Sequence, residues 1–426
     1  MKIHLYSESP DPGPGGAEQF VAVLAEALSL QHEVCIVHHK EHLTSNELEE
    51  YSGCDLKQVT FRYIAPARDE SRRCTTLWTR LLAARAWRRQ LSEGSDVFIA
   101  LLHNKAPFCR APLGVMVALF PTYDPDVELI EPPRKAPPKK SKKKKKSKPK
   151  PVKKKDPRDI GRAGMFAWRW LHRIYCQWEW KRRMGTYPIK LSISEFTRGW
   201  TRTRWRVESD LLHPPVLLPE QTGQQKENLI LSVGRFATTG HTKKQLEMLT
   251  AFRDLRTSLS SDWRYACVGG LNDMPDDHAY FEHVRSLSET DVINVQANLP
   301  RDELRQLYSR ASLFWHAAGY GDDSDAHPEM AEHFGLTTVE AMAAGCVPVV
   351  IKKGGQPEIV QHGVNGFVWS TLDELKHYTE TLVRDEKLRT QMSEKARDRA
   401  ADFSRHACVA RLLQATGLSG SPSSHT

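Results

Sequence analysis

The sequence of 426 residues lacks paired cysteines, long apolar runs and a serine-hydrolase signature. Its eight cysteines are scattered without a CxxC spacing, which favours a reducing compartment over a disulfide framework. No apolar run reaches the length of about 18 residues that a membrane helix needs, and the amino terminus has no signal-type apolar core. No GxSxG stretch is present. We therefore expect a cytoplasmic protein whose contact with a membrane, if it has one, is peripheral, on the inner face.

The positive charge of the chain is concentrated in one segment. The formal net charge is +9, but residues 131–159 hold 15 Lys and Arg against 3 Asp and Glu, a net charge of +12. The rest of the chain is therefore slightly acidic, at −3. Because such a lysine-rich segment has too few apolar residues to form a core, we expect it to be disordered and extended.

Strand and helix patterns alternate along both halves of the chain. The length suits two domains of about 200 residues each. The alternation predicts an α/β protein with two facing Rossmann-like, doubly wound domains. Strands are expected over 3–7, 34–38, 97–102, 189–193, 229–233, 265–268, 313–316 and 347–351, and helices over 17–30, 194–205, 244–255 and 300–309.

The boundary between the two domains is expected at the proline break that follows residue 213. Residues 1–213 form the first predicted domain and 214–418 the second. Residues 419–426 are expected to be a disordered tail. The first domain contains the lysine-rich insert, at about 131–159, and a basic aromatic helix, at about 162–183.

Two glutamates eight residues apart, Glu332 and Glu340, lie in the stretch EHFGLTTVEAMAAGCVPVV. The stretch predicts a helix that opens near Gly335 and ends at Gly345, before the strand at 347–351. Glu340 then lies in the helix and Glu332 in the loop before it, so both carboxylates can face one ligand. Because carboxylates accept hydrogen bonds from vicinal hydroxyls, the pair indicates a nucleotide-sugar site. An exposed helical Glu and an unrelated loop Glu are the alternative.

Cationic and main-chain groups at predicted element ends suit the phosphates of such a ligand. Arg235 follows the strand at 229–233, and Lys243 begins the next helix. A fixed Arg and Lys can neutralise a diphosphate leaving group without a metal. Lys244 adjoins Lys243, and the pattern does not decide which lysine makes the contact. The main-chain amides at residues 334–336 suit an anion or a sugar oxygen.

Two further groups lie where predicted strands of the first domain end. Gly15 and Gly16 open a helix, so their amides could approach a diphosphate without a Cβ in the way. A tight turn between strand and helix is the alternative. His103 follows the strand at 97–102, and strand ends of this kind face the ligand crevice of an open α/β sheet. A structural histidine is the alternative there.

Together these segments resemble the retaining glycosyltransferases of family four, the glycosyl transferases group 1, which have the two-domain GT-B fold. The family carries two glutamates separated by seven residues and followed by a helix rich in Ala and Gly. The resemblance leaves out only residues near 125 to 185. It covers GPGGAEQF, LSISEFTRGW, ILSVGRF with HTKKQLEMLTAF, and residues 314–369.

The resemblance implies a reaction and a role for each site residue. It implies metal-independent, retaining transfer of a hexose from a nucleoside diphosphate sugar, without a cofactor, to a glycan or lipid-linked acceptor in cell-envelope polysaccharide synthesis. The first domain would bind the acceptor and the second the donor, whose base would lie near residues 296–299. Glu332, His103 and the amides of Phe334, Gly335 and Leu336 would contact the sugar, Glu340 the ribose, and Arg235, Lys243, Gly15 and Gly16 the diphosphate.

Other readings of the sequence stay open. The cluster Asp322, Asp323, Asp325 and His327 is typical of a solvated loop rather than a metal site. His241 is interpreted as a loop residue rather than a phosphate ligand. An epimerase or phosphorylase on the same scaffold would use a related site. A non-catalytic protein that binds a nucleotide sugar or an anionic surface is the alternative from another class.

The basic aromatic helix indicates a possible partner. Aromatic and apolar residues recur at helical spacing between arginines and lysines, next to the lysine-rich insert. This combination suits an anionic membrane surface or a phosphorylated lipid acceptor. A solubilising loop and a helix packed on the first domain are the alternatives, and nucleic acid is a less favoured partner. The apolar residues are Phe166, Trp170, Leu171, Ile174, Tyr175 and Trp178.

Overall fold

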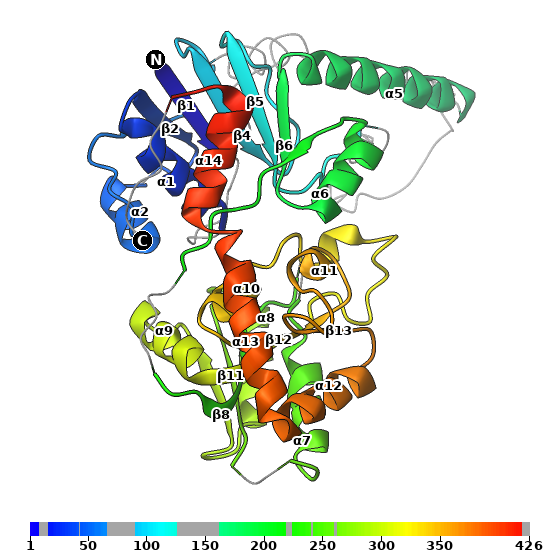
Figure 1. The fold of residues 1–426 in the computed structure, drawn as a ribbon. Coiled ribbons are helices and arrows are strands. Elements are labelled where there is room, and N and C mark those ends of the chain that lie inside the picture. Colours follow the sequence, from blue (N-terminus) through cyan, green and yellow to red (C-terminus); the bar gives the residue numbers. More distant parts are fainter. Residues whose placement is uncertain are drawn as a thin grey trace, which may run out of the picture.

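The computed structural model shows two lobes, each built on a parallel β-sheet with flanking helices (Figure 1). This architecture confirms the predicted two-domain α/β fold. The lysine-rich insert and residues 420–426 lie outside the part of the chain that the structure describes. The structure describes residues 1–7, 16–41, 43–65, 90–125, 162–218, 224–239, 242–259 and 262–419.

The first sheet has the strand order β3-β2-β1-β4-β5-β6-β7. All of its strand pairs are parallel. Helices cover parallel sheets on both faces, so the inner strands are nearly continuous apolar runs; all six residues of β4 are buried. The strands are β1 (Lys2–Ser7), β2 (Glu33–His38), β3 (Thr60–Tyr63), β4 (Val97–Leu102), β5 (Leu113–Ala118), β6 (Ile189–Ser192) and β7 (Asp210–Leu211).

The second sheet has the order β10-β9-β8-β11-β12-β13 and is also parallel. The strand predicted over 347–351 is observed with the same bounds. All five of its residues are buried, as is typical of an inner strand in a parallel sheet. The strands are β8 (Glu227–Val233), β9 (Arg264–Gly269), β10 (Ile293–Ala297), β11 (Ala311–His316), β12 (Val347–Ile351) and β13 (Phe367–Trp369).

Helices connect the strands and cover the sheets. In the first lobe they are α1 (Gly16–Ser29), α2 (Ser45–Ser52), α5 (Arg162–Met184), α6 (Glu195–Trp200) and the π-helical turn η1 (Thr201–Trp205). Along the rest of the chain they are α7 (Gln245–Leu255), α8 (Pro275–Ser286), α9 (Arg301–Arg310), the 3-10 turn η2 (Pro328–Met330), α10 (Leu336–Ala343), α11 (Gln356–Ile359), α12 (Leu372–Arg384), α13 (Glu386–Ala401) and α14 (Arg405–Thr416).

The single helix predicted over 194–205 is divided in the structure. Ser194 caps α6, and its side chain accepts a hydrogen bond from the main-chain N–H of Thr197. After Trp200 the backbone widens into the π-helical turn. The turn ends at Arg206, which has left-handed backbone angles.

Each sheet has a point where the strand order reverses. In the first sheet this point lies between β1 and β4, and in the second between β8 and β11. Ligands of open α/β sheets bind beside the carboxyl ends of the strands at such a point. The segments after β1, β4, β8 and β11 are therefore the places where the fold supports a site.

The last helix crosses back to the first lobe. Figure 1 shows α13 in the lower lobe and α14 in the upper one, where α14 packs on α1. Between them, the main-chain N–H of Val216 donates to the carbonyl of Phe403 (3.0 Å). The division at residues 213 and 214 had assigned the α14 segment to the second domain, whereas its packing joins it to the first. The strand alternation alone could not place a terminal amphipathic helix.

Candidate functional site

An ion pair marks the reversal point of the second sheet. The side-chain ammonium of Lys243 contacts Oε2 of Glu332. The same oxygen lies 3.3 Å from Nε2 of His316, the last residue of β11. All three side chains are mostly buried, with exposed fractions of 16%, 18% and 3% for Lys243, Glu332 and His316. A cation, a carboxylate and an imidazole thus meet at one edge of the sheet.

The imidazole of His316 orients the carboxylate of Glu332. Burial lowers the pKa of His316 below its ordinary value, although the neighbouring Glu332 acts in the opposite direction. A neutral imidazole with its proton on Nε2 donates a hydrogen bond to Glu332. His316 was not among the residues selected from the sequence. It is the last residue of a strand, so the argument that selected His103 at a strand end applied to His316 as well.

The side chain of Lys243 packs directly against the backbone of Gly234. A Cβ placed on Gly234, directly after β8, would lie 2.6 Å from Cγ of Lys243. The buried amide of Gln245 holds this turn, because its Nε2 donates to the carbonyls of Gly234 (3.2 Å) and Arg235 (3.0 Å). The turn therefore holds Arg235 directly after the end of β8, where the sequence placed it, and its side chain is exposed.

The two adjacent lysines point to different partners. Lys244 has left-handed backbone angles (φ 58°) and directly precedes α7. Its ammonium lies 3.0 Å from Oδ1 of Asp322, in the loop after β11. Lys243 is thus the lysine that faces Glu332, whereas Lys244 is held by another carboxylate. His241 lies outside the described residues.

The second glutamate of the pair occupies a separate, partly buried position. Glu340 lies in α10, as predicted, and its Oε2 accepts a hydrogen bond from the hydroxyl of Tyr308 (3.0 Å). Burial raises the pKa of Glu340 to about 7, an effect that the Tyr308 hydrogen bond partly opposes. Glu332 and Glu340 therefore face different polar surroundings.

The first domain touches the amino end of α10. A Cβ on Gly16, at the start of α1, would lie 2.6 Å from Cδ1 of Leu336. Two predicted site residues from opposite domains are thus in contact. Gly15 lies outside the described residues.

His103 also faces the second domain. It directly follows β4, and its ring centroid lies 6.4 Å from that of His333, the neighbour of Glu332. The ring of His333 stacks on Phe120 at 3.9 Å with an interplanar angle of 6°. The strand end that carries His103 and the loop that carries Glu332 therefore meet across the domain boundary.

The segment 332–336, at which the sequence predicts contacts with the donor, is called the donor loop here and contains the remaining predicted residues. The side chain of Phe334 is only 3% exposed and belongs to an apolar cluster shared by both domains. Gly335 precedes α10 with a φ of 128°, and Leu336 is the first residue of that helix. The chain therefore brings the amides of 334–336 to a helix start, as expected.

The acidic loop after β11 is held by contacts within the protein. Oδ1 of Asp323 accepts hydrogen bonds from the amides of Asp325 and Ala326 (3.1 Å each), and Asp322 pairs with Lys244. At the other predicted location, the base-binding segment 296–299, Oδ1 of Asn298 accepts from the amide of Leu271 (2.8 Å). Both segments lie at the carboxyl edge of the second sheet.

Two facing Rossmann-like lobes with polar groups at their reversal points define a GT-B architecture. Comparison with known proteins agrees: residues 218–399 match the family model described as glycosyl transferases group 1. The matched segment lies in the second domain, which is therefore similar to this family. This confirms the resemblance inferred from the sequence motifs.

Solved structures share the fold at low sequence identity. Anabaena Alr3699/HepE in complex with UDP and glucose superposes with a TM-score of 0.59 and 15% identity, over 97% of this chain and 98% of that chain. WaaG, a glycosyltransferase involved in lipopolysaccharide biosynthesis, superposes with a TM-score of 0.58 and 16% identity, over 98% and 100%. These similarities confirm the GT-B fold.

Curated relatives match part of the chain. A GDP-Man:Man(3)GlcNAc(2)-PP-Dol alpha-1,2-mannosyltransferase of Dictyostelium discoideum is 31% identical over 187 residues, 42% of this chain and 35% of the relative. An alpha-1,3/1,6-mannosyltransferase of Homo sapiens is 22% identical over 272 residues, 57% of this chain and 62% of the relative. The chain therefore spans less than two thirds of the length of these relatives.

Proposed function

We propose that the protein is a glycosyltransferase that moves a hexose from a nucleoside diphosphate sugar to a glycan or lipid-linked acceptor. The observation that carries the proposal is the contact of Lys243 with Glu332, at the reversal point where nucleotides bind in such sheets. A cation for phosphate and a carboxylate for sugar hydroxyls are adjacent there. The match of residues 218–399 to the family model supports the same reaction class.

In this proposal the ion pair exchanges partners when the donor binds. The ammonium of Lys243 turns to the diphosphate, and the carboxylate of Glu332 accepts hydrogen bonds from sugar hydroxyls. Lys243 and Arg235 then stabilise the charge that develops on the leaving diphosphate. His316 keeps the carboxylate of Glu332 oriented during this exchange, because it donates to the same oxygen.

In this proposal Glu340 binds the ribose, and the first domain contacts the transferred sugar. Glu340 lies one helical turn inside α10, where its carboxylate accepts from Tyr308 and has further lone pairs for ribose hydroxyls. His103 reaches the donor loop from β4 and would orient the sugar. We further propose that transfer retains the anomeric configuration, with the leaving phosphate taking the acceptor proton, and that it needs no metal.

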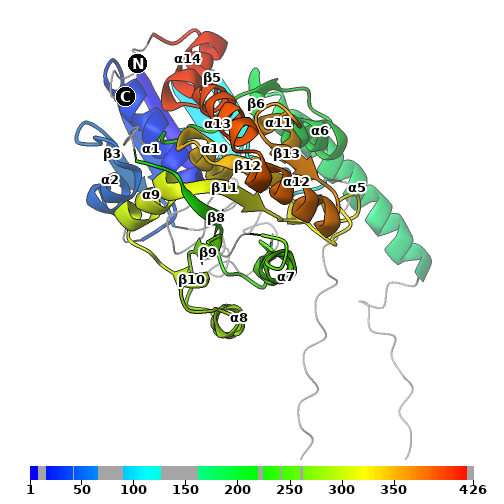
Figure 2. The same cartoon turned by 60° about the horizontal axis from the view of Figure 1, so that its bottom comes forward.

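The acceptor side of the proposal rests on α5. Its carboxyl-terminal part is anchored by Trp180 and Arg183, which are 3% and 0% exposed. Its preceding turns project from the first lobe (Figure 2). There the side chains of five apolar residues are exposed by 44% to 59%. We call this surface the α5 face; it comprises Trp170, Leu171, Ile174, Tyr175 and Trp178.

An anionic lipid surface fits the α5 face. Cationic side chains border it, and the guanidinium of Arg182 lies 4.8 Å from the centre of the Trp178 ring. Aromatic residues flanked by Arg and Lys bind at the boundary between headgroups and acyl chains. Within the described residues, no helix is long and apolar enough to cross a membrane. We propose peripheral contact that would bring a lipid-linked acceptor to the cleft.

Nucleotide release from a donor panel tests the transferase proposal. UDP-, GDP- and ADP-sugars are incubated with the purified protein and EDTA, and both the nucleotide and the sugar product are identified. Release of nucleoside diphosphate together with a glycoside or free hexose supports transfer. A changed nucleotide sugar would indicate an epimerase. Binding without any product would favour the non-catalytic alternative.

Vesicle sedimentation tests the α5 face. The double variant Trp170→Ser and Trp178→Ser is compared with wild type on vesicles with and without phosphatidylglycerol. We expect wild type to bind the anionic vesicles and the variant to lose most of that binding, because the exposed rings supply the buried apolar area. The control Leu218→Ser changes an exposed apolar residue away from α5. Equal binding by all three proteins would contradict the proposal.

A further inference from the structure

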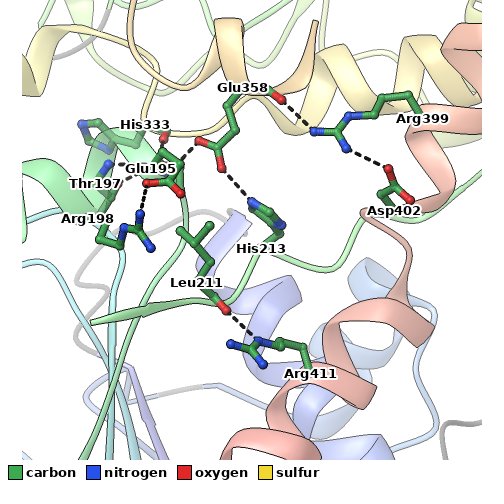
Figure 3. Close-up of polar contacts among 11 residues, drawn as sticks. Glu195, Thr197, Arg198, Leu211, His213, His333, Glu358, Arg399, Asp402 and Arg411 are labelled. Atoms are coloured by element: carbon green, nitrogen blue, oxygen red, sulfur yellow. Dashed lines mark hydrogen bonds and ion pairs between the residues drawn. The ribbon is translucent and has the colours of Figure 1, made fainter. Parts of the chain in front are cut away.

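One carboxylate joins the two domains beside the donor loop. The main-chain N–H of Glu195 donates to Oε2 of Glu358 (2.7 Å), and Oε1 of Glu358 lies 2.7 Å from Nε2 of His213. Glu195 begins α6 in the first lobe, His213 follows β7, and Glu358 belongs to α11. Figure 3 shows the Glu358 side chain directed at both partners. A single side chain of the second domain therefore contacts both the first lobe and the segment that links the two domains.

His213 packs against the donor loop. Its ring centroid lies 5.6 Å from that of Phe334 with the planes 30° apart, and its edge meets Phe403 at 5.0 Å. Phe334 and Phe403 are almost completely buried. Because Glu358 fixes the rotation of the imidazole, it also fixes the surface on which Phe334 rests.

The main chain of the donor loop is held from both domains. The carbonyl of Glu332 accepts from the amide of Gly355 (2.8 Å), just before α11. The carbonyl of His333 accepts from the hydroxyl of Ser194 (2.6 Å), the capping residue of α6. Arg399 secures α11 in turn, because it donates to the carbonyl of Glu358 (2.8 Å). Movement of α6 relative to α11 would therefore displace the donor loop.

We propose that Glu358 and His213 are positioning residues that couple the arrangement of the two domains to the donor loop. With α6 docked on α11, the carboxylate of Glu332 and the amides of 334–336 have the geometry that the sugar needs. Without the Glu358 contacts, the loop is released together with the start of α6. Hydrogen bonds to a carboxylate are stronger than neutral ones, and loss of one partner leaves the others unsatisfied. The catalytic part of this inference rests on the proposed transferase activity.

Hydrogen exchange of the ligand-free protein tests the coupling without reference to activity. In Glu358→Ala we expect the amides of α6 and of the segment 332–339 to exchange roughly 10-fold faster, and to do so together. Glu358→Gln keeps an acceptor for the Glu195 amide and should fall between wild type and Glu358→Ala. The matched control is Glu394→Gln, an exposed glutamate of α13. Faster exchange in α6 alone, with the loop unchanged, would overturn the proposal.

His213→Gln separates the two contacts. A glutamine can still donate to Glu358 but has no ring to support Phe334. We therefore expect the loop to exchange faster while α6 stays close to wild type. The same exchange in loop and α6 as in wild type would contradict a role for the ring.

Turnover provides the catalytic arm of the test. With UDP-glucose and GDP-mannose as probes, Glu358→Ala should lower kcat by roughly 10-fold or more and change the donor KM much less, because the donor's diphosphate contacts are intact. Glu358→Gln should recover kcat in part, as it does the slow exchange. If wild type releases no nucleotide from any donor, the transferase proposal fails, and the exchange comparison still decides the coupling.

Discussion

Lys243 and Glu332 form an ion pair between the turn after β8 and the loop after β11, 89 residues apart in the sequence. Their pairing neutralises two mostly buried charges that would otherwise be costly to desolvate. A bound diphosphate sugar would offer each group a new partner of the appropriate kind. The ligand-free site is therefore preorganised, because the groups already lie side by side.

Replacement of Lys243 should affect catalysis far more than replacement of Lys244. We expect Lys243→Ala to lower kcat by about 10²–10³-fold, since one cation that stabilises the leaving diphosphate is removed. Lys244→Ala loses the contact with Asp322 and should keep kcat near wild type. Initial rates of nucleotide release at saturating donor provide the measurement. Equal losses in both variants would contradict the assignment to Lys243.

The imidazole of His316 should influence turnover through Glu332. His316→Phe keeps a buried ring but removes the donor to the Glu332 carboxylate, so we expect kcat to fall about 10-fold. The thermal stability of the variant should remain close to that of wild type, because a neutral buried imidazole is replaced by an apolar ring of similar size. Unchanged kcat in a folded variant would show that Lys243 alone orients Glu332.

Burial on both faces was enough to predict two strands, whereas the buried strand β5 was missed. β4 and β12 were expected over 97–102 and 347–351 and have those bounds, since an uninterrupted apolar run of this length is typical of a parallel strand. The edge strand β3 was missed because half of its residues are exposed. The destination of α14 was missed because an amphipathic helix carries no mark of the domain on which it packs.

Residue types suggested part of the candidate site, and other parts of it became visible only in the backbone geometry. Glu332, Glu340 and Arg235 could be selected by motif and strand position. The choice between Lys243 and Lys244 depends on the left-handed backbone at residue 244, which directs the neighbouring side chains to different partners. His213 and Glu358 could not be paired from the sequence, because their contact arises from the packing of the two domains.

Protonation of Glu340 should make stability depend on pH in a defined direction. Its pKa is raised from 4.5 to about 7 in the folded protein. The folded state then holds the proton more tightly than the unfolded state, so this contribution to stability is fully present below 4.5 and is lost as the pH rises to about 7. Glu340→Gln stays neutral and should lack this loss.

The stability difference is measurable by thermal unfolding across this pH range. From acidic to neutral pH, the free energy of unfolding of Glu340→Gln should rise relative to that of wild type by an amount on the order of 1–3 kcal/mol. The exposed Glu394→Gln is the control and should follow wild type throughout. Parallel pH curves for Glu340→Gln and wild type would show that the pKa of Glu340 is not raised.

Donor binding should depend on the same proton. The ionised carboxylate of Glu340 is a stronger acceptor for the two ribose hydroxyls than the protonated form, so donor affinity should increase as the pH rises through about 7. Glu340→Gln should bind more weakly at neutral pH and lose this dependence. Calorimetric titration with the donor found in the panel gives both results. If the affinity of Glu340→Gln still depends on pH, the titration of another group is responsible.

The contact between Gly16 and Leu336 allows a double-mutant test of the domain interface. A Cβ at residue 16 would come within 2.6 Å of the end of the Leu336 side chain, so Gly16→Ala should displace that side chain at the start of α10 and raise the donor KM. Leu336→Ala makes room for the methyl group. If the contact is only steric, the donor KM of the double variant should return towards the wild-type value. The interaction free energy between the two substitutions would then be about 0.5–3 kcal/mol. A KM that stays raised in the double variant would mean that the donor itself needs the space beside Gly16, as expected if its phosphates approach the amide there.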